Sequence, residues 1–530
     1  GARYKLALGA REVPDPFARW LPEGVHGPAI VTGVSRFHWR NGPGLARPLR
    51  EQVLYEVHVG TFTPAGTYRA AAAKLPLVAE LGVTTIELMR LSAFPGARGW
   101  GYDGVAHFAP HAPYGTPDEL RAFVDEAHGL GLSVLLDVVY NHFGPSGSYL
   151  GVFSDRWFRH DVKTPWGDAL DYRTPAMRQY LLESARYWLE EFRFDGLRLD
   201  AISTIVDDTR PSVLGELADL ARALVPAKLL VAEDDRNRQE VVTELGLSAV
   251  WADDFHHQAH VVLTGERDGY YRAYQPDVRE LARVIERGWL YEGQGFEPWG
   301  RPRGGPADAL EAEAFVYCLQ NHDQIGNRAR GERLHSLVSL ERYLAAAALL
   351  LLLPATPLLF MGQEWGASAP FLYFTDHEPE LGAAVTRGRR EEFAGFAGFA
   401  DPHQRERIPD PQAESTFLRS KLDWRERESG QHARVLEVHR RAIELRRSDP
   451  VLREVSRRGL RAWVDGDLLV VTFEARGARR ALVVSFSDAE APVPEPLADL
   501  EVLFETRASP PGVVAPCAAR FGALDAEERS

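Results

Sequence analysis

The stretch AMRQYLLESARYWLEEFRFDGLRLDA (176–201) joins an amphipathic helical pattern to a strand pattern across a short turn. Its last part, DGLRLDA (195–201), alternates apolar and charged residues as an extended strand does. Because successive side chains of a strand point to opposite faces, Arg198 and Asp200 share one face. The stretch therefore predicts a helix followed by a strand that ends in a guanidinium beside a carboxylate.

Units of this kind recur on both sides of the stretch, from about residue 51 to residue 445. Strand patterns alternate there with amphipathic segments, and the strands are QVLYEVHVG, VTTIELMRL, LSVLLDVVY, DGLRLDA, KLLVAED, AVWADD, AFVYCLQN and TPLLFMG. Alternation of strand and helix is typical of parallel βα units. Eight such units in a chain of this length predict an α/β fold, a closed (β/α)8 TIM barrel.

The two ends of the chain have a different texture. After about residue 450, RAWVDGDLLVVTFEA, RRALVVSFSD and DLEVLFET are short alternating strands separated by turns, which predicts a C-terminal antiparallel β-sandwich module. The first 45 or so residues are rich in Pro and Gly and indicate only a short N-terminal β remnant or connector. We expect three parts, at 1–48, 49–447 (the barrel with loop insertions) and 448–530.

Composition excludes several classes of partner. Acidic residues outnumber basic ones and leave a formal net charge of −14, which disfavours a nucleic acid. The longest apolar run, LAAAALLLLL (344–353), is half the roughly 20 residues that span a bilayer, so we expect a buried helix and no membrane. Cys318 and Cys517 give neither a disulfide framework nor a zinc pattern. The cysteine usage fits a reducing compartment and GARYKLALGA has no secretory pattern, so a cytoplasmic location is expected.

Polar side chains close four of the predicted strands, and the C-terminal strand ends of a barrel meet at one mouth. They are Asp137, Asn141 and His142; Arg198 and Asp200; Glu233, Asp234 and Asp235; and Asn321, His322 and Asp323. Any one group could be structural, because Asp and Asn close strands routinely, but four at the same end indicate a site. Carboxylates without a cysteine or a metal-type histidine cluster favour glycoside chemistry.

Two further features fit that chemistry. Arg198 beside Asp200 favours the ionised carboxylate that a nucleophile requires. After the second strand, Trp100 and Tyr102 in RGWGYDG are candidate stacking platforms for sugar rings. His256 and His260 lie four apart on an expected helix, a spacing that can bind metal, but no third ligand is identifiable.

Four blocks carry a resemblance to a known family. DVVYNH (137–142), DGLRLDA (195–201), VAED (231–234) and LQNHDQ (319–324) resemble, in order, the sequence blocks of the α-amylase clan of glycoside hydrolases. The resemblance implies Asp200 as nucleophile, Glu233 as general acid/base, and Asp323 as the third carboxylate that binds and distorts the sugar. It also implies that the same subsite is lined by Tyr102, His142, Arg198 and His322.

The segments between the blocks, among them YEVHVGTFTPAGTY, TPWGDALDY, AEDDRN and DDFHHQAH, are similar to the trehalose-releasing hydrolases of that clan. The similarity implies hydrolysis of the α-1,4 bond next to the terminal trehalose of maltooligosyltrehalose, with retention of configuration. It places Asp254 and His257 on the trehalose side. It also implies related α-glucans as ligands and functional pairing with an enzyme that forms maltooligosyltrehalose.

No cofactor and no metal are expected. Residues 201–210, AISTIVDDTR, lack the Lys-His pair that many α-amylases carry after the nucleophile, and Asn141 alone does not supply the six to eight oxygens of a calcium site. Two other readings stay open. A glucan branching or debranching enzyme would keep the same carboxylates, whereas a glycan-binding protein would have lost one of Asp200, Glu233 and Asp323.

Overall fold

The computed structural model describes residues 1–33, 37–44, 47–164 and 166–524. Its centre is a closed parallel barrel, which confirms the predicted fold class. The strands are β5 (Leu54–Val57), β6 (Thr85–Leu88), β9 (Ser133–Val138), β12 (Gly196–Leu199), β13 (Leu229–Glu233), β14 (Ala249–Trp251), β17 (Phe315–Cys318) and β18 (Thr356–Phe360). They follow one another around the barrel in chain order, and β18 closes it by pairing Leu358 with Leu54 of β5. These are the eight strands that the sequence patterns indicate.

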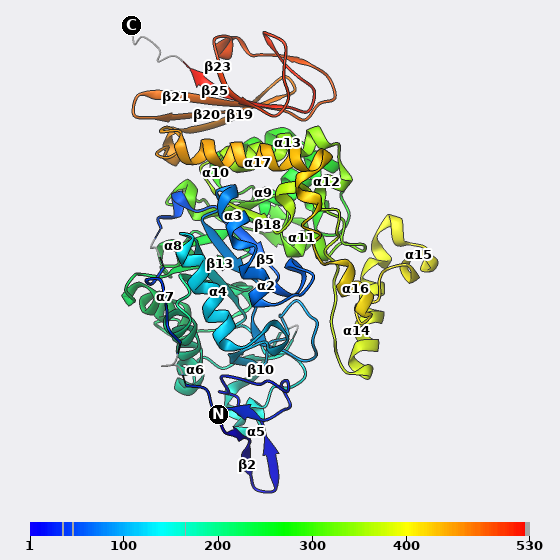
Figure 1. Cartoon of the computed structure of the whole chain (residues 1–530). Helices are drawn as coiled ribbons and strands as arrows, with labels where there is room; N and C mark the ends of the chain where they lie inside the picture. Colours follow the sequence, from blue (N-terminus) through cyan, green and yellow to red (C-terminus); the bar gives the residue numbers. More distant parts are fainter. Residues whose placement is uncertain (34–36, 45–46, 165, 525–530) are drawn as a thin grey trace.

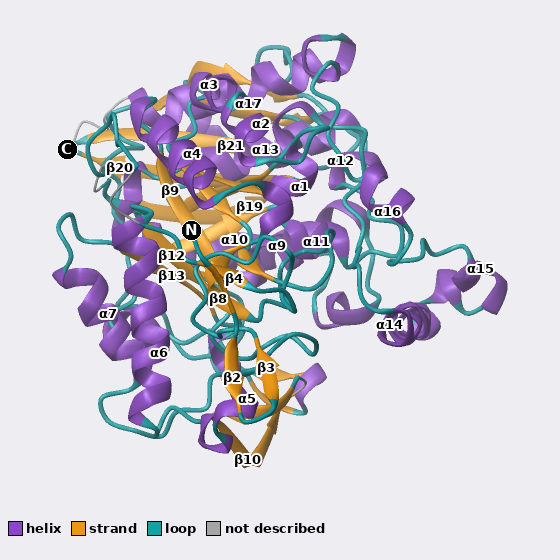
Figure 2. Ribbon diagram, turned by 60° about the horizontal axis from the view of Figure 1, so that its bottom comes forward, coloured by secondary structure: helices purple, strands orange, loops and turns teal. Residues whose placement is uncertain are grey.

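Helices surround the barrel (Figure 2). They include α2 (Tyr68–Ala72), α3 (Leu75–Leu81), α4 (Pro117–Gly129), α6 (Pro175–Arg186), α7 (Val213–Ala223), α9 (Asp253–Thr264), α10 (Val278–Arg287) and α13 (Leu340–Leu352). The opening stretch forms α6, a turn of π-helix (Tyr187–Glu191) and then β12, as expected of one unit. Helix α13 is buried along its length from Tyr343 to Leu352, as predicted for the apolar run. None of the helices described is both long and apolar enough to span a bilayer.

Helix α17 (Gly430–Ser448) separates the barrel from the C-terminal part (Figure 1). Beyond it, five strands form an antiparallel sheet: β19 (Leu460–Asp465), β20 (Leu468–Ala475), β21 (Ala478–Ser485), β25 (Ala519–Leu524) and β23 (Glu501–Glu505). Strands β22 (Ala491–Pro492) and β24 (Val513–Val514) pair separately. One apolar core runs from the barrel into this sheet and includes Leu469, Val471 and Phe473.

The N-terminal residues form two small antiparallel pairs, β1 (Arg3–Tyr4) with β4 (Ala29–Ile30) and β2 (Leu6–Leu8) with β3 (Arg11–Val13). They lie at the opposite end of the molecule from the C-terminal sheet (Figure 1). Two long insertions follow barrel strands. The hairpin of β10 (Phe158–Thr164) and β11 (Gly167–Leu170) comes after β9, and α14 (Pro379–Glu392), α15 (Pro402–Glu406) and α16 (Glu414–Arg419) come after β18.

Candidate active site

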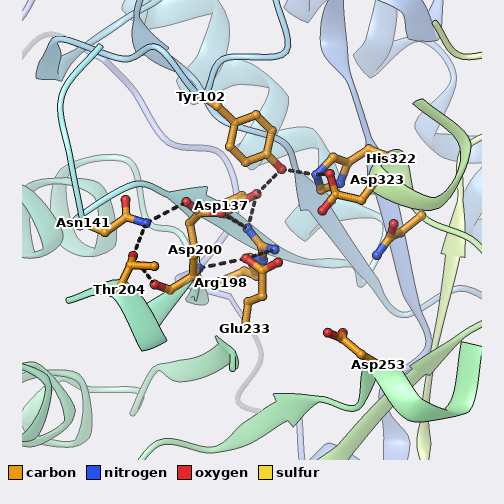
Figure 3. A network of polar contacts seen from close by, with 12 residues as sticks. Tyr102, Asp137, Asn141, Arg198, Asp200, Thr204, Glu233, Asp253, His322 and Asp323 are labelled. Carbon is orange, nitrogen blue, oxygen red and sulfur yellow. Dashed lines mark hydrogen bonds and ion pairs between the residues drawn. The ribbon is translucent and has the colours of Figure 1, made fainter. Parts of the chain in front are cut away.

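The C-terminal strand ends bring the predicted polar residues into one network (Figure 3). It draws on β9, β12 and β13 and on the segments that follow β6 and β17. The residues are Tyr102, Asp137, Asn141, Arg198, Asp200, Glu233, His322 and Asp323. Strand register explains part of the grouping, because Arg198 is level with Asp137 on one side and with Val231 on the other.

Asp200 is a buried carboxylate between two guanidinium groups. Arg198 Nη1 lies 3.1 Å from its Oδ1, Arg90 pairs with the same oxygen, and Asn141 Nδ2 donates to Oδ2 at 3.2 Å. Burial alone would raise the pKa of Asp200, but the charges of Arg90 and Arg198 outweigh it and hold that pKa well below its usual range. Asp200 is therefore ionised at neutral pH, as the Arg198 argument predicts.

Glu233 is held by the same guanidinium, but its pKa is shifted upward and not downward. Arg198 Nη2 lies 2.7 Å from Glu233 Oε2, and the backbone N–H of Ala201 donates to that oxygen at 2.8 Å. Burial raises the pKa of Glu233 well above its ordinary value; Arg198 opposes this shift, whereas the negative charge of Asp200 adds to it. Glu233 keeps its proton and hydrogen-bonds to Asp200. Two neighbouring carboxyls with opposite protonation states are the requirement for acid/base work on a glycoside.

Ala201 contributes through its backbone. Its φ of 37° lies in the left-handed region that side-chain-bearing residues rarely occupy. The residue directly follows Asp200, and in this conformation its N–H points at Glu233. A strained residue at a strand end thus links the two carboxyls through the main chain.

His322 is fixed by a partner that the sequence analysis missed. Its Nδ1 lies 2.5 Å from Glu56 Oε1, its backbone N–H donates to Glu56 Oε2 at 3.0 Å, and its Nε2 contacts the Tyr102 hydroxyl. Burial lowers the pKa of His322, but Asp323 and Glu56 outweigh it and raise that pKa above the usual value. The signal for Glu56 was present, because it is the one charged residue in the run VLYEV (53–57) of the first strand.

Asp323 is the most open of the three predicted carboxylates, with its side chain 33% exposed. Its Oδ1 lies 3.4 Å from His322 Nε2 and accepts from Asn327 Nδ2 at 3.3 Å. It therefore faces the mouth, where a bound sugar would contact it.

His142 lies on the other side of Tyr102. Its Nε2 is 3.1 Å from the Tyr102 carbonyl oxygen, and its Nδ1 is 2.8 Å from Asn141 Oδ1. Burial lowers the pKa of His142 to about 4, so the ring is neutral. Trp166 stacks on it with ring centroids 4.2 Å apart and is itself 45% exposed. Trp166 is an aromatic surface at the rim that the sequence analysis did not single out.

Trp100 corrects an expectation. It is only 7% exposed, its Nε1 donates to the Leu372 carbonyl at 3.0 Å, and it stacks on Phe371. Its ring also lies edge-on to His322. Trp100 is therefore part of the wall behind the site, and Tyr102 is the residue of RGWGYDG that faces a substrate.

The sequence analysis also missed two residues of the site, Glu87 in β6 and Arg90 in the turn after it. The guanidinium of Arg90 lies over the Tyr102 ring, pairs with Asp200 and is 3.5 Å from Asp137 Oδ1. Glu87 is level with Glu56 in the barrel and buried, and within the described chain neither of its carboxyl oxygens has a hydrogen-bond partner. Burial, with added repulsion from Glu56 and Asp137, raises the pKa of Glu87 well above its usual range, so this carboxyl is neutral. Both are the charged residues of the predicted strand VTTIELMRL, so the sequence carried the same signal for them as for Glu56.

Asp254 is not placed as expected. It is 0% exposed and accepts hydrogen bonds from Tyr274 Oη at 2.6 Å, Arg303 Nη1 at 3.0 Å and Asn237 Nδ2 at 2.8 Å. The backbone N–H groups of residues 290 and 291 complete its shell. Such a fully satisfied buried carboxylate holds loops together and does not face a sugar.

Asp253, the preceding residue, faces the site where Asp254 does not. Its carboxyl points toward the network (Figure 3), its side chain is 22% exposed, and no hydrogen bond to it occurs among the described residues. Because consecutive helical residues are about 100° apart, the first two residues of α9 face different sides. Burial raises the pKa of Asp253 to about 7, with the negative charges of Asp235 and Asp254 adding to the shift against Arg303.

The histidines of α9 all have structural neighbours. His257 is half-buried, with its ring 5.3 Å from Tyr270 and its Nδ1 3.3 Å from the Tyr274 hydroxyl. His260 Nε2 pairs with Glu266 at 2.8 Å, and His256 lies beside Cys318. In the part of the chain that the structure describes, no group of three or more His, Cys, Asp or Glu side chains is arranged to hold a metal ion.

Barrel, mouth and carboxylates together define an α-amylase-type glycoside hydrolase. The alpha-amylase catalytic-domain family model matches residues 14–156. A malto-oligosyltrehalose trehalohydrolase of Deinococcus radiodurans is 54% identical over 91% of this chain and 80% of its own length, and one of Rhizobium sp. is 42% identical over 89% and 83%. The chain belongs to the malto-oligosyltrehalose trehalohydrolase family.

Solved structures agree. A putative alpha amylase from Salmonella typhimurium superposes with a TM-score of 0.93 at 39% identity, over 99% of this chain and 91% of that one. A pullulanase from Anoxybacillus, with a TM-score of 0.72 at 16% identity over 97% of this chain and 77% of that one, shares the fold. The resemblance to the α-amylase clan is thereby confirmed.

Proposed function

We propose that this protein hydrolyses the α-1,4-glucosidic bond next to the terminal trehalose of maltooligosyltrehalose and releases trehalose. The observation that carries the proposal is the pair of carboxyls on Arg198, in a chain of the trehalohydrolase family. The site lowers the pKa of Asp200 and raises that of Glu233, which suits the first to be the nucleophile and the second the proton donor. A branching enzyme from Corynebacterium jeikeium is 28% identical over 69% of this chain, so the hydrolase reading has the stronger support.

The reaction follows from the two protonation states. Asp200 attacks the anomeric carbon as the bond to trehalose breaks, and Glu233 gives its proton to the departing trehalose oxygen. A glycosyl ester on Asp200 results, and Glu233 is left as a carboxylate. Glu233 then takes a proton from water, whose oxygen attacks the same carbon and frees Asp200. The two inversions leave the configuration retained.

The contact of the Arg198 guanidinium with both carboxyls supports this double displacement over a single inverting step. An inverting pair needs carboxyls roughly 6.5–9.5 Å apart to admit a water between them, whereas a retaining pair stands about 5–5.5 Å apart. Here one guanidinium contacts both carboxyls, at 3.1 Å and 2.7 Å, and the carboxyls are themselves hydrogen-bonded. The two carboxyls therefore lie closer together than an inverting pair requires.

We assign the remaining residues by what they face. Asp323, Tyr102, His142 and His322 would hold the sugar on the glycone side of the cleaved bond. Asp253 stands beyond Glu233, at the start of α9 and just after β14, the strand next to β13, and would bind hydroxyls of the leaving trehalose in place of Asp254. His257, beside Tyr270 and Tyr274, would lie farther out on the same side.

Three further points belong to the proposal. Its trehalose-capped substrate requires a partner enzyme that forms maltooligosyltrehalose. Two unpaired cysteines support a reducing compartment, for which we propose the cytoplasm. The division at 1–48, 49–447 and 448–530 stays a prediction.

The test is product chromatography after incubation with maltotriosyltrehalose and, separately, with maltopentaose. Free trehalose should form from the first substrate at a rate at least about a hundredfold above any cleavage of the second, a difference of roughly 2.7 kcal/mol in transition-state binding. Equal rates on the two substrates would leave a general α-glucan hydrolase. Transfer to sugar hydroxyls without free trehalose would leave a branching-type enzyme.

A further inference from the structure

The N-terminal end of the barrel, opposite the catalytic mouth, contains a cavity of about 490 Å³ rich in arginine. Its lining residues are Arg47, Arg50, Glu51, Arg446, Arg447, Arg453 and Glu454. Contacts locate it, because Arg446 Nη2 donates to the carbonyl of Ala355, just before β18, and Arg447 Nη1 donates to that of Gly82, just before β6. Positive charge is thus concentrated at one place in a chain whose formal net charge is −14.

Carboxylates neutralise only part of this charge. Arg50 pairs with Glu313 at 3.0 Å, Glu51 lies 4.0 Å from Arg47, and Glu454 pairs with Arg476 from outside the lining. The other three guanidiniums have no carboxylate partner among the described residues. Two of them, those of Arg446 and Arg447, contact main-chain carbonyls, and the Arg453 side chain has no hydrogen bond or ion pair there.

The excess charge and the side-chain type indicate the ligand. Guanidinium groups match phosphate oxygens in geometry and remain charged when desolvated. Three unmatched positive charges suit a ligand with two or three negative charges, and the volume lies within the range of small-molecule sites. Burial lowers the pKa of Arg446 to about 10, because the negative charge of Glu313 compensates only part of its lost hydration.

We propose that this cavity binds a small phosphorylated metabolite through Arg446, Arg447 and Arg453. The site is separate from the glycosidase mouth, so it does not rest on the function proposed above. Residues 47–51 lead into β5, whereas residues 446–454 comprise the last turn of α17 and the start of its connection to the C-terminal sheet. A bound phosphate would therefore join the barrel to the segment that carries the C-terminal sheet and would stabilise both.

Isothermal titration calorimetry on the whole chain tests the proposal, with pyrophosphate, ATP and glucose 6-phosphate as separate probes. At least one probe should bind saturably at one site, and Arg447→Ser and Arg453→Ser should each weaken that binding tenfold or more. Both side chains are exposed, so the variants should fold; Arg446 is buried and is left intact. Arg407→Ser is the matched control, because it removes an exposed arginine beside the distant α15 (Figure 1).

The same probes should raise the melting temperature of the parent protein and raise it less in the two variants. If ATP binds most tightly, the cavity is a nucleotide site. If glucose 6-phosphate binds most tightly, it is a sugar-phosphate site. If all three probes bind equally, the cavity recognises the phosphate group alone. The proposal is overturned by the absence of saturable binding for all three probes. It is also overturned if Arg447→Ser and Arg453→Ser bind as the parent does, or if Arg407→Ser weakens binding equally.

Discussion

Removing the Asp253 carboxylate should weaken recognition of trehalose without harming the fold. The side chain points into the site, is 22% exposed and has no hydrogen-bond partner in the described structure; the ion-pair contact recorded for it there is a long one, 4.0 Å to His256 Nε2, so its removal should cost the fold little. A hydrogen bond from a sugar hydroxyl to a charged group contributes about 1.5–3 kcal/mol. Asp253→Ala should therefore lower kcat/KM on maltotriosyltrehalose by roughly 10- to 150-fold, at about 1.4 kcal/mol per factor of ten.

The loss should be specific to the trehalose-capped substrate. A linear maltopentaose cannot place the second glucose of an α,α-1,1 link at Asp253, so its slow cleavage should change less than threefold. The ratio of the two kcat/KM values, from initial rates by product chromatography, is the measured quantity. Asp253→Asn keeps the shape and a neutral hydrogen bond, so its loss should lie between that of the parent and that of the alanine variant.

The ionisation of Asp253 should also make the substrate ratio depend on pH. Because the pKa of Asp253 is raised to about 7, the carboxylate is ionised above that pH and neutral below it. The substrate ratio of the parent should therefore fall as the pH drops below 7, whereas that of Asp253→Asn should stay flat across the same interval. A ratio with the same pH profile in both proteins would contradict the assignment.

Asp254 is the matched control one residue away. Asp254→Ala leaves Arg303 buried without its carboxylate, which costs on the order of 3–5 kcal/mol of unfolding free energy. Chemical denaturation should register this loss, and the substrate ratio of the folded fraction should be unchanged. The assignment of Asp253 to trehalose is refuted if Asp253→Ala lowers kcat/KM equally on both substrates. It is also refuted if Asp254→Ala changes the ratio of the two kcat/KM values.

Three further predictions concern the catalytic network. Asp200→Asn should abolish turnover in a protein that still folds, and activity within about tenfold of the parent would remove Asp200 from the nucleophile role. Glu87→Gln should keep kcat within about threefold, because the native carboxyl is already neutral; a loss above about a hundredfold would show that its charge is needed. Glu56→Gln removes a negative charge that raises the pKa of His322, so the histidine should lose its proton at lower pH; an unshifted His322 resonance in an NMR titration would count against this.

Local patterns in the sequence were sufficient for the architecture and for part of the site. Alternating strands and amphipathic segments predict parallel units, because apolar periodicity is a property of short stretches. The two-residue repeat of a strand puts Arg198 and Asp200 on one face, and the strand-end rule brings Glu233 and Asp323 to the same mouth. These inferences need no knowledge of distant contacts.

Only the tertiary structure decided which side chains complete the site. Glu56 reaches His322 across 266 positions of the chain, because closure of the barrel places β5 near the end of β17, and no local pattern encodes that pairing. Whether Asp253 or Asp254 faces the site depends on how α9 is rotated about its own axis, and the packing of the helix against the barrel sets that rotation. The opposite protonation of Asp200 and Glu233 likewise arises from burial and from the shared Arg198, which are properties of the assembled barrel and not of any one strand.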